Sequence, residues 1–474
     1  MGQTLKTLLQ TRWGDGWLIG LSSEEFWQRL GELISVFAAY KESCGAHSPG
    51  VLIIEPDPLL FLATCLSAWS EGCTVVLANP RWGDRDRQQL QALVSPNLNA
   101  PLRPGIKSYP CQVRESQPGQ ILIPTGGSSG QIKFAVHTWD TLSVAIAGFR
   151  AHFGVGAVQA YCVLPLFHVS GLMQALRVLT SGGQLALQSY SKLKNRERWL
   201  LPPGGFLSLV PTQLQDLLAL GDEFIPWLQS FRAVLLGGAP AGKSLLDQAQ
   251  SLGIPVALTY GMTETAAQVA TLLPEEFLAG NRSSGRPLPH VNLAILNDQG
   301  QPQRSGQTGR VVIQTKSLAL GYTDCSSDQG YNEKVAHVIG TAHPTGFTAD
   351  DMGYLDAGGY LHIVGRSSSK IITGGENVFP EAIEAVLLAT GWVSDACVVG
   401  LPCDRWGQRL CALVVMDSAK RLADLPGLLR SLLAPYKLPK QWILVSALPR
   451  TAQGKLSRPQ ALALAQKILG MDSI

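Results

Sequence analysis

The sequence predicts an α/β protein with parallel strands and more than one domain. Short apolar runs, VLIIE, CTVVLA and AVLLGG among them, alternate with amphipathic stretches, and several end in Gly or Pro just before a helical pattern. The chain has 474 residues, which is too long for one ordinary core. Functional loops in such folds follow the carboxyl ends of strands, so the segments after these runs are the first candidates for a site.

The expected elements change in character along the chain. The strands of the α/β part are expected at 51–55, 73–78, 121–124, 160–165, 205–210, 233–238 and 255–261. From about residue 286 the pattern becomes that of short antiparallel strands with Gly and Asn-Asp turns, at 292–303, 309–315 and 359–366. Strand and helix patterns then alternate again at 370–375, 380–390, 395–402, 411–417 and 424–435, which is enough chain for a small domain.

Composition excludes several classes of protein. Only 15% of residues are charged and the net charge is +3, so neither nucleic acid nor an anionic membrane is expected as a partner. The most apolar early run, 51–69, is interrupted by Glu55, Pro56, Asp57 and Pro58, which favours a strand and a helix over a membrane span. No secretory or myristoylation signal is recognised at the N-terminus. Nine scattered cysteines without a C-x-x-C pair indicate reduced thiols in a cytoplasmic protein, not disulfides or zinc.

A Gly- and Ser-rich loop follows the run at 121–124. It reads Thr125-Gly126-Gly127-Ser128-Ser129-Gly130, and Lys133 comes soon after. Glycines let the backbone approach a ligand, hydroxyls and N–H groups surround phosphate oxygens, and a lysine adds a point charge. The spacing is not that of a P-loop. A phosphate site is therefore the functional hypothesis, and a flexible surface turn is the alternative.

Four further stretches carry side chains suited to a nucleotide. In YGMTET, Glu264 is a candidate Mg²⁺ ligand and Thr263 a candidate phosphate donor, with a helix N-cap as the alternative. In FTADDMGYLD, an Asp is placed to accept from ribose hydroxyls, with an Asx turn as the alternative. Residues 365–384 join a strand end to a Gly-Gly turn, and Pro380 then opens a helix. PRTAQGKLSR carries Lys455, which could equally be a solvated lysine.

Together and in this order, these stretches resemble the adenylate-forming superfamily of acyl-CoA synthetases, adenylation domains and luciferases, over nearly the whole chain. Three departures stand out. The usual T-S-G-T-T-G-x-P-K loop is TGGSSGQIK here, and the usual T-G-D is Ala349-Asp350-Asp351. The hinge position falls on Ser369 with Lys370 beside it, so the pivot residue stays open. The resemblance implies a large N-terminal domain (1–365) of α/β layers with mixed sheets and a distorted β-barrel subdomain, a hinge (366–370) and a small mobile α+β domain (371–474).

The resemblance also implies a reaction in two halves. A carboxylate attacks the α-phosphate of ATP, giving an acyl-adenylate and pyrophosphate, and the thiol of coenzyme A then displaces AMP. Mg²⁺ assists the first half, and Lys455 bridges carboxylate and α-phosphate there. The small domain then rotates, withdraws Lys455 and presents the Gly374-Gly375-Glu376 turn to the thiol. The implied catalytic residues are Lys455, Glu264, Thr263 and His168, the implied metal ligand is Glu264, and the implied cofactor-binding residues are Thr125, Gly126, Gly127, Ser128, Ser129, Gly130, Lys133, Gly238, Ala239, Pro240, Tyr260, Gly261, Asp351, Arg366, Gly374 and Gly375.

The acid is indicated by finer resemblances. GMTETAAQ with Gln268, the GGENVFP turn and the GGSSG loop are most similar to the 2-succinylbenzoate–CoA ligases of menaquinone and phylloquinone synthesis, in their cyanobacterial and plastid branch. His168 falls where the superfamily lines its acyl pocket, although it could also be a core histidine. The second carboxylate of that acid needs a cationic partner, for which Lys194, Arg196, Arg177 and Arg286 are candidates. The partners expected are small molecules only, and the chain is expected to be a monomer or homodimer.

Three alternatives remain open. A medium-chain or aryl acyl-CoA synthetase would have a uniformly apolar pocket. An enzyme that loads a carrier protein would need that carrier as a partner in trans. A non-catalytic nucleotide-binding relative is expected to have lost Lys455 or Glu264, and both are present.

Overall fold

The computed structural model describes residues 4–45, 49–99, 101–113, 117–126, 132–195, 204–324, 346–373, 376–403, 406–417, 421–450 and 456–471. These residues form two compact units. The first comprises Met1–Gly238, Gly253–Leu293 and Ile313–Thr348, and the second comprises Ala239–Leu252, Ala294–Val312 and Ala349–Ile474.

The first unit contains two large sheets. The eight-stranded sheet has the order β1 (Leu18–Ile19), β8 (Leu185–Leu187), β7 (Ala160–Cys162), β9 (Phe206–Leu209), β10 (Ala233–Leu236), β11 (Val256–Met262), β12 (Ala267–Thr271), β13 (Arg286–Pro287). The six-stranded sheet has the order β16 (Gly321–Asp324), β6 (Ile132–Thr138), β5 (Gln120–Gly126), β3 (Thr74–Leu77), β2 (Gly50–Ile53), β4 (Ser108–Cys111). β1 to β11 of the first sheet run parallel, as do β2, β3 and β5 of the second. β12, β13, β4, β6 and β16 pair antiparallel with their neighbours, so both sheets are mixed.

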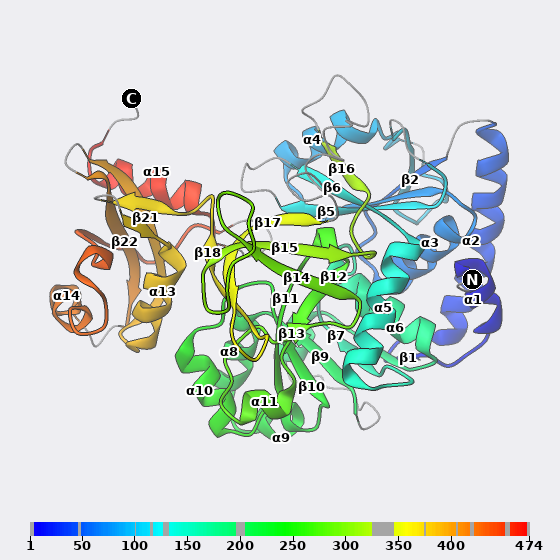
Figure 1. Ribbon diagram of the computed structural model, residues 1–474. Helices are drawn as coiled ribbons and strands as arrows, with labels where there is room; N and C mark the ends of the chain where they lie inside the picture. The colour runs from blue at the N-terminus through cyan, green and yellow to red at the C-terminus, as the bar shows by residue number, and fades with distance from the viewer. Residues whose placement is uncertain are drawn as a thin grey trace. The chain divides into compact units, whose positions relative to one another are not determined.

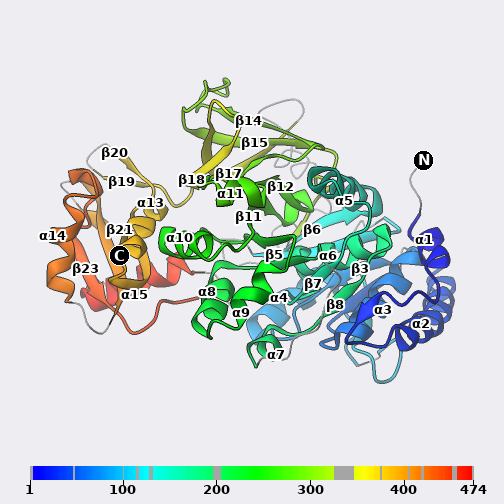
Figure 2. The same cartoon turned by 90° about the horizontal axis from the view of Figure 1, so that it is seen from below.

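Helices cover these sheets and fill the space between them. They are α1 (Leu5–Thr11), α2 (Ser23–Ser43), α3 (Pro58–Ser70), α4 (Asp84–Val94), α5 (Trp139–Phe153), α6 (Val169–Ser181), α7 (Tyr190–Lys194), α8 (Pro211–Ala219), α9 (Phe224–Gln229), the 3₁₀ helix η1 (Thr263–Thr265) and α11 (Pro274–Leu278). The largest core joins α3, α5 and α6 to strands of both sheets, and Figure 1 shows α5 and α6 between them. In Figure 2, α1, α2 and α3 lie together beside the six-stranded sheet. None of the helices in the described ranges is long and apolar enough to cross a membrane.

Local sequence explains the two central helices. The Thr138 and Thr141 side chains form a capping box at the start of α5, and Gly154 ends it with φ 61°. α6 begins after His168 and ends at Gly182 with φ 78°. Residues 171–179 of α6 are all buried, including Arg177. A charged side chain in that position is unusual, because Arg is almost never fully buried without a partner.

The remaining strands form two smaller sheets. One has the order β14 (Val291–Leu296), β15 (Gly309–Thr315), β17 (Phe347–Leu355), β18 (Leu361–Arg366), in the region where short antiparallel strands were expected. The other, in the second unit, has the order β20 (Glu376–Val378), β19 (Ile371–Thr373), β22 (Gly407–Met416), β21 (Val393–Cys403), with β23 (Gln441–Leu444) also on β22. The second unit's helices are α10 (Lys243–Ser251), α13 (Pro380–Ala389), η2 (Leu422–Asp424), α14 (Leu425–Leu429), η3 (Pro435–Lys437) and α15 (Arg458–Ile468).

The predicted fold class is confirmed. The helix expected at 424–435 is shorter, because α14 ends at Leu429 and carries Pro426 and Gly427 in its first turns. The eight cysteines in the described ranges are all free thiols, in line with the predicted reduced state.

Candidate functional site

The strands on either side of the Gly- and Ser-rich stretch, β5 and β6, pair antiparallel up to Gly126 and Ile132. Thr125 at the end of β5 pairs with Lys133 near the start of β6. The Lys133 ammonium lies 5.8 Å from the ring centroid of Tyr322 on β16. Gly127, Ser128, Ser129 and Gly130 lie outside the described residues. The hairpin therefore places the first hydroxyl and the lysine of the predicted phosphate loop on neighbouring strands.

The Glu264 carboxylate is held by two hydroxyls. Glu264 lies on η1, and its Oε1 accepts hydrogen bonds from Tyr322 Oη at 2.7 Å and from Thr125 Oγ1 at 3.4 Å. Oε2 has no hydrogen-bond partner among the described residues and is the oxygen left for a ligand. Burial raises the pKa of Tyr322 above its usual range, and the charge and hydrogen bond of Glu264 raise it further. Tyr322 thus stays neutral and donates its hydrogen bond to the Glu264 carboxylate.

A buried histidine contacts the backbone of the turn that carries Thr263 and Glu264. His137 on β6 is fully buried, with its Nε2 2.8 Å from the Thr263 carbonyl oxygen and its Nδ1 3.0 Å from Thr141 Oγ1. Burial lowers the pKa of His137 to about 4, so the ring is neutral. Because the carbonyl can only accept, Nε2 carries the proton. No sequence motif pointed to His137.

The same turn has a constrained backbone. Ala266 and Ala267 follow it with φ of 55° and 89°, a region that residues with a Cβ rarely adopt. The buried Thr265 hydroxyl donates to the Ala267 carbonyl oxygen at 2.8 Å, and the Glu264 carbonyl oxygen accepts from Ala319 N at 2.8 Å. Strained backbone of this kind persists only where its surroundings hold it, and it is concentrated at functional sites.

Two of the segments implied to bind the cofactor, 238–240 and 260–261, lie at or just beyond the ends of the adjacent parallel strands β10 and β11. β10 ends at Leu236, and Gly238 adopts φ 80° just beyond it. Tyr260 and Gly261 lie on β11 at a register shift against β12, and a Cβ on Gly261 would come within 2.0 Å of the Ala267 carbonyl oxygen. Such irregularities redirect side chains beside active sites. Ala239 and Pro240 follow Gly238 in the second unit.

In the second unit, the two neighbouring aspartates have separate roles. The Asp350 carboxylate accepts from the backbone N–H of Ser368 at 3.0 Å and from its hydroxyl, so it closes the turn after β18. The Asp351 carboxylate faces Arg366 across β17 and β18, and Arg366 Nε donates to its Oδ1 at 3.3 Å. Asp350 thus holds the turn after β18, and Asp351 is paired with Arg366 across the two strands.

The predicted hinge is tied to the start of α13. The Ser369 hydroxyl donates to Glu381 Oε1 at 2.8 Å, and Arg458 Nη2 donates to the same oxygen at 3.0 Å. Arg458 also forms a two-point ion pair with the buried Glu384, at 2.5 and 2.7 Å. Burial lowers the pKa of Arg458, but the hydrogen bonds and charge of Glu384 outweigh it and the net pKa is raised. Gly374, Gly375 and Lys455 lie outside the described residues.

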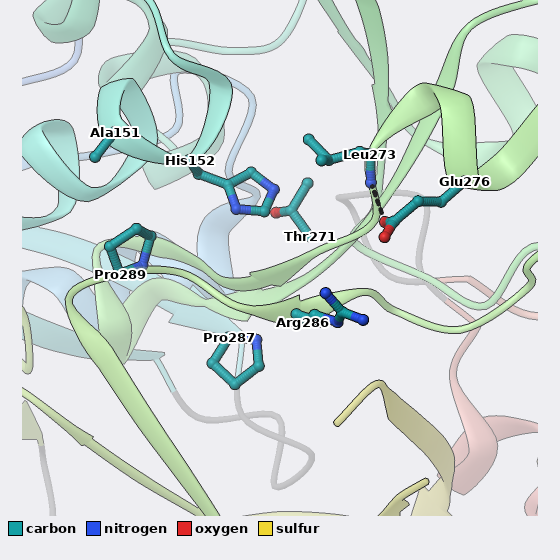
Figure 3. A pocket seen from close by; sticks show the side chains of 8 residues that line it. All are labelled: Ala151, His152, Thr271, Leu273, Glu276, Arg286, Pro287 and Pro289. Carbon is teal, nitrogen blue, oxygen red and sulfur yellow. Dashed lines mark hydrogen bonds between the residues drawn. The ribbon is translucent and has the colours of Figure 1, made fainter. Parts of the chain in front are cut away.

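His168 is half-buried at the N-cap of α6, with its ring centroid 4.6 Å from that of Phe167. A separate cavity of about 310 Å³ is lined by the side chains in Figure 3, which come from α5, β12, α11 and the β13 region. Among the predicted site residues and candidate cations it contains only Arg286, which is exposed. This cavity is therefore distinct from the residues gathered around Glu264.

Comparison with known proteins agrees with this arrangement. The family model described as AMP-binding enzyme matches residues 101–323, and the AMP-binding enzyme C-terminal domain matches residues 382–455. A 2-succinylbenzoate–CoA ligase of Geobacillus kaustophilus is 36% identical over 73% of this chain and 69% of its own length. The chain belongs to the AMP-binding enzyme family. A second family member of the same name, from Geobacillus sp. strain WCH70, is 33% identical over 83% of this chain and 79% of its own length.

Solved structures show the family fold. The o-succinylbenzoate coenzyme A synthetase of Bacillus subtilis in complex with AMP has a TM-score of 0.78 at 24% identity, covering 96% of this chain and 97% of its own. An amide bond synthetase of Marinactinospora thermotolerans has a TM-score of 0.77 at 22% identity, covering 97% and 99%. The family models and the curated relatives confirm the adenylate-forming superfamily that the motifs predicted.

Proposed function

We propose that this protein is an ATP-dependent 2-succinylbenzoate–CoA ligase of menaquinone or phylloquinone synthesis. It joins 2-succinylbenzoate to coenzyme A through an acyl-adenylate and releases pyrophosphate and AMP. The similarity to ligases of that name supports the choice of acid, at 36% and 33% identity. The observation that carries the chemistry is the Glu264 carboxylate, oriented by Tyr322 and Thr125 with Oε2 left for a ligand.

The first half-reaction is assigned to the residues around Glu264. One carboxylate oxygen of the acid bonds to the α-phosphorus of ATP, and the bond from that phosphorus to the bridging oxygen breaks as pyrophosphate leaves. Glu264 would hold Mg²⁺, which neutralises phosphate charge when bound and prefers oxygen ligands from one or two carboxylates plus phosphates. Thr263 would donate to the α-phosphate, and Thr125, Lys133 and the loop between them would surround the leaving pyrophosphate.

The remaining parts of ATP are assigned to the strand ends. Asp351 would accept hydrogen bonds from the ribose hydroxyls, and Arg366 would donate to them. The 237–240 segment and the ring of Tyr260 would border adenine, which stacks favourably on an aromatic face. His168 would line the acyl pocket.

The second half-reaction is assigned to a small domain at 371–474 that turns about 366–370. The coenzyme A sulfur bonds to the acyl carbon, and AMP leaves with the electron pair of the broken carbon–oxygen bond. Lys455 would serve only the adenylation step, and Gly374 and Gly375 would approach the pantetheine arm afterwards. The hydrogen bond from the Ser369 hydroxyl to Glu381 supports a pivot here, because rotation about 366–370 would exchange this contact between the hinge and α13 for others. We place the reaction in the cytoplasm, on the strength of the free thiols.

Isotope exchange tests this proposal. With 2-succinylbenzoate, Mg²⁺ and ATP but no coenzyme A, the protein should exchange labelled pyrophosphate into ATP, because the acyl-adenylate forms reversibly. Adding coenzyme A should release one AMP per thioester. Formation of ADP and phosphate in place of AMP would contradict the adenylate mechanism. A medium-chain or aryl acid that outperforms 2-succinylbenzoate would favour the second candidate, an acyl-CoA synthetase with an apolar pocket.

A further inference from the structure

The two faces of strand β6 have different partners. The even-numbered residues of 132–136 are buried in one cluster with apolar side chains of α4, and Figure 1 shows α4 beside this strand. Side chains alternate along a strand, so Lys133 and His137 lie on the opposite face. There the His137 Nε2 lies 2.8 Å from the Thr263 carbonyl oxygen. One face of β6 thus packs on α4, and the other faces the residues assigned to ATP.

The first residue of β6 lies where the sheet pairing runs out. Ile132 begins the strand directly after the Gly- and Ser-rich stretch. β5 pairs with β6 as far as Ile132, whereas the described residues of β16 pair with it as far as Lys133. The ends of strands open locally unless other groups bind their backbone and hold it in place.

A glutamine of α4 binds this strand end. Gln89 Oε1 accepts a hydrogen bond from the Ile132 N–H at 2.8 Å. Gln89 is half-buried, and the next residue along the helix, Leu90, belongs to the same buried cluster as the Ile132 side chain. The same turn of α4 therefore supplies both a polar contact and an apolar contact to the start of β6.

The segment before α4 fixes the helix against the strand. The Trp82 ring is buried, and its centroid lies 6.4 Å from that of Phe134 on β6. Arg87 Nε on α4 donates to the Trp82 carbonyl oxygen at 3.0 Å. A side chain positions another group well only if packing holds its own element in place. Gln89 meets this condition.

The residue that follows Ile132 is Lys133, which is assigned to the phosphates. Its ammonium lies 5.8 Å from the ring centroid of Tyr322, and the Tyr322 hydroxyl donates to Glu264. A shift of the backbone at Ile132 is passed to Lys133, because the two residues share a planar peptide group. Misplacement of a reacting group by about 1 Å can lower a rate by about a hundred-fold.

We propose that Gln89 is a positioning residue for adenylation: by accepting from the Ile132 N–H, it fixes the start of β6 and holds the Lys133 ammonium at the β- and γ-phosphates of ATP. The inference rests on the proposed function, which assigns Lys133 to the leaving pyrophosphate. Gln89 acts through the strand and makes no contact with the nucleotide. Its effect is therefore confined to ligands that carry the β- and γ-phosphates, and AMP carries neither.

Equilibrium binding of ATP and of AMP to the full-length protein, each with Mg²⁺, tests the inference. Gln89→Met keeps a side chain of similar length and removes the acceptor oxygen. The ratio of the Kd for AMP to the Kd for ATP should fall about three- to ten-fold, as expected for one lost hydrogen bond, while the Kd for AMP changes by less than about two-fold. A residue that only stabilised the fold would leave this ratio unchanged.

The two half-reactions give a second measurement on the same variant. In pyrophosphate exchange, the KM for ATP should rise about three- to ten-fold, and the KM for the acid should stay at the wild-type value. Thioester formation from supplied acyl-adenylate should keep the wild-type rate, because the acyl-adenylate has lost the β- and γ-phosphates.

Two further variants test whether the acceptor oxygen is the cause. Gln89→Glu keeps an acceptor at the same reach, and its ratio of dissociation constants should lie within about two-fold of wild type. It is measured at about 0.15 M salt, where charges more than about 8 Å apart are largely screened. Gln89→Asn keeps the amide but is one methylene shorter, so it should show the same fall in the ratio as Gln89→Met.

Gln159→Met is the matched control. Gln159 is also half-buried, and its Oε1 accepts from the Gln184 N–H at 2.7 Å just before β7 and β8 begin. This bond lies at the amino ends of parallel strands, whereas ligands of such sheets bind at the carboxyl ends. The control should lower the melting temperature by an amount similar to Gln89→Met and keep the wild-type ratio of dissociation constants.

The outcomes separate this inference from the proposed function. A wild type that exchanges no pyrophosphate into ATP with 2-succinylbenzoate overturns the proposed function, and nucleotide binding, which needs no acid, still decides the inference. An unchanged ratio in Gln89→Met overturns the inference alone, as does a Gln89→Glu protein that is impaired as much as Gln89→Met. If Gln89→Met does not fold, an unchanged ratio in Gln89→Asn overturns it.

Discussion

The Tyr322 hydroxyl donates a 2.7 Å hydrogen bond to Glu264 Oε1, joining the last strand of the six-stranded sheet to the turn after β11. The two residues are 58 positions apart, and no motif links them. The bond occupies Oε1 of the carboxylate and leaves Oε2 for a ligand. A carboxylate that binds a metal ion, when the other ligands are phosphate groups, must be held in one orientation.

Removing that hydroxyl should weaken adenylation. Tyr322→Phe leaves the ring in place and removes a hydrogen bond to a charged group, which is worth about 1.5–3 kcal/mol. Pyrophosphate exchange should therefore fall roughly 10- to 100-fold, with a higher Mg²⁺ requirement. Tyr190→Phe is the control, because its hydroxyl donates to the Gln213 carbonyl oxygen at 2.9 Å in the same unit. Equal losses in both variants would mean that Tyr322 acts only on stability.

The buried His137 predicts an acid-sensitive fold. Its pKa is about 4 in the folded protein and about 6.5 when unfolded. Between these values the unfolded chain binds a proton that the native state does not, so native stability falls as pH decreases from about 6.5 to about 4, by roughly 3 kcal/mol for this group. His137→Gln should show a shallower fall in melting temperature over that range than the wild type. Parallel curves would contradict the assignment.

A proline at the hinge should separate the two half-reactions. Ser369→Pro fixes φ and removes an N–H that donates to the Arg366 carbonyl oxygen at 3.2 Å. Thioester formation should fall by more than about ten-fold relative to pyrophosphate exchange. Ser369→Ala, which removes only the hydroxyl bonded to Glu381, is the control for side-chain loss. Equal loss of both half-reactions in the proline variant would argue against rotation at this point.

The lysine near the C-terminus should matter in one half-reaction only. Lys455→Ala is expected to lower pyrophosphate exchange by about 10²–10⁴-fold, because a positive charge at the α-phosphate is lost. Thioester formation from supplied acyl-adenylate should remain close to wild type. If both steps are unchanged, the role given to Lys455 is wrong.

Sequence patterns located the strand ends but not the contacts across them. Thr125, Glu264 and Asp351 were predicted because hydroxyls and carboxylates follow apolar runs, and Tyr260 was implied by the family resemblance. The structure places Thr125 and Glu264 at or beside a strand end, whereas Tyr260 lies within β11 and Asp351 within β17. Tyr322 and His137 were not found, because a lone Tyr or His within a strand has no local signal.

The antiparallel strands β6 and β12 in the two large sheets, and the contact between Arg177 and Gln268, were also not predicted from the sequence. Pairing direction at β6 and β12 depends on hairpin turns whose residues suit many conformations. Gln268 is 91 positions from Arg177, and a buried arginine on α6 cannot be told from an exposed one by periodicity alone.

The proposed function depends on 2-succinylbenzoate being the acid that the enzyme activates. The most direct measurement is AMP release with ATP, Mg²⁺ and coenzyme A over a panel of 2-succinylbenzoate, benzoate, octanoate and palmitate. A kcat/KM for 2-succinylbenzoate at least about a hundred-fold above the others is predicted, because only that acid of the panel offers a second carboxylate for a cationic side chain to pair with. A preference for octanoate or benzoate would contradict the claim while leaving the fold and the family intact.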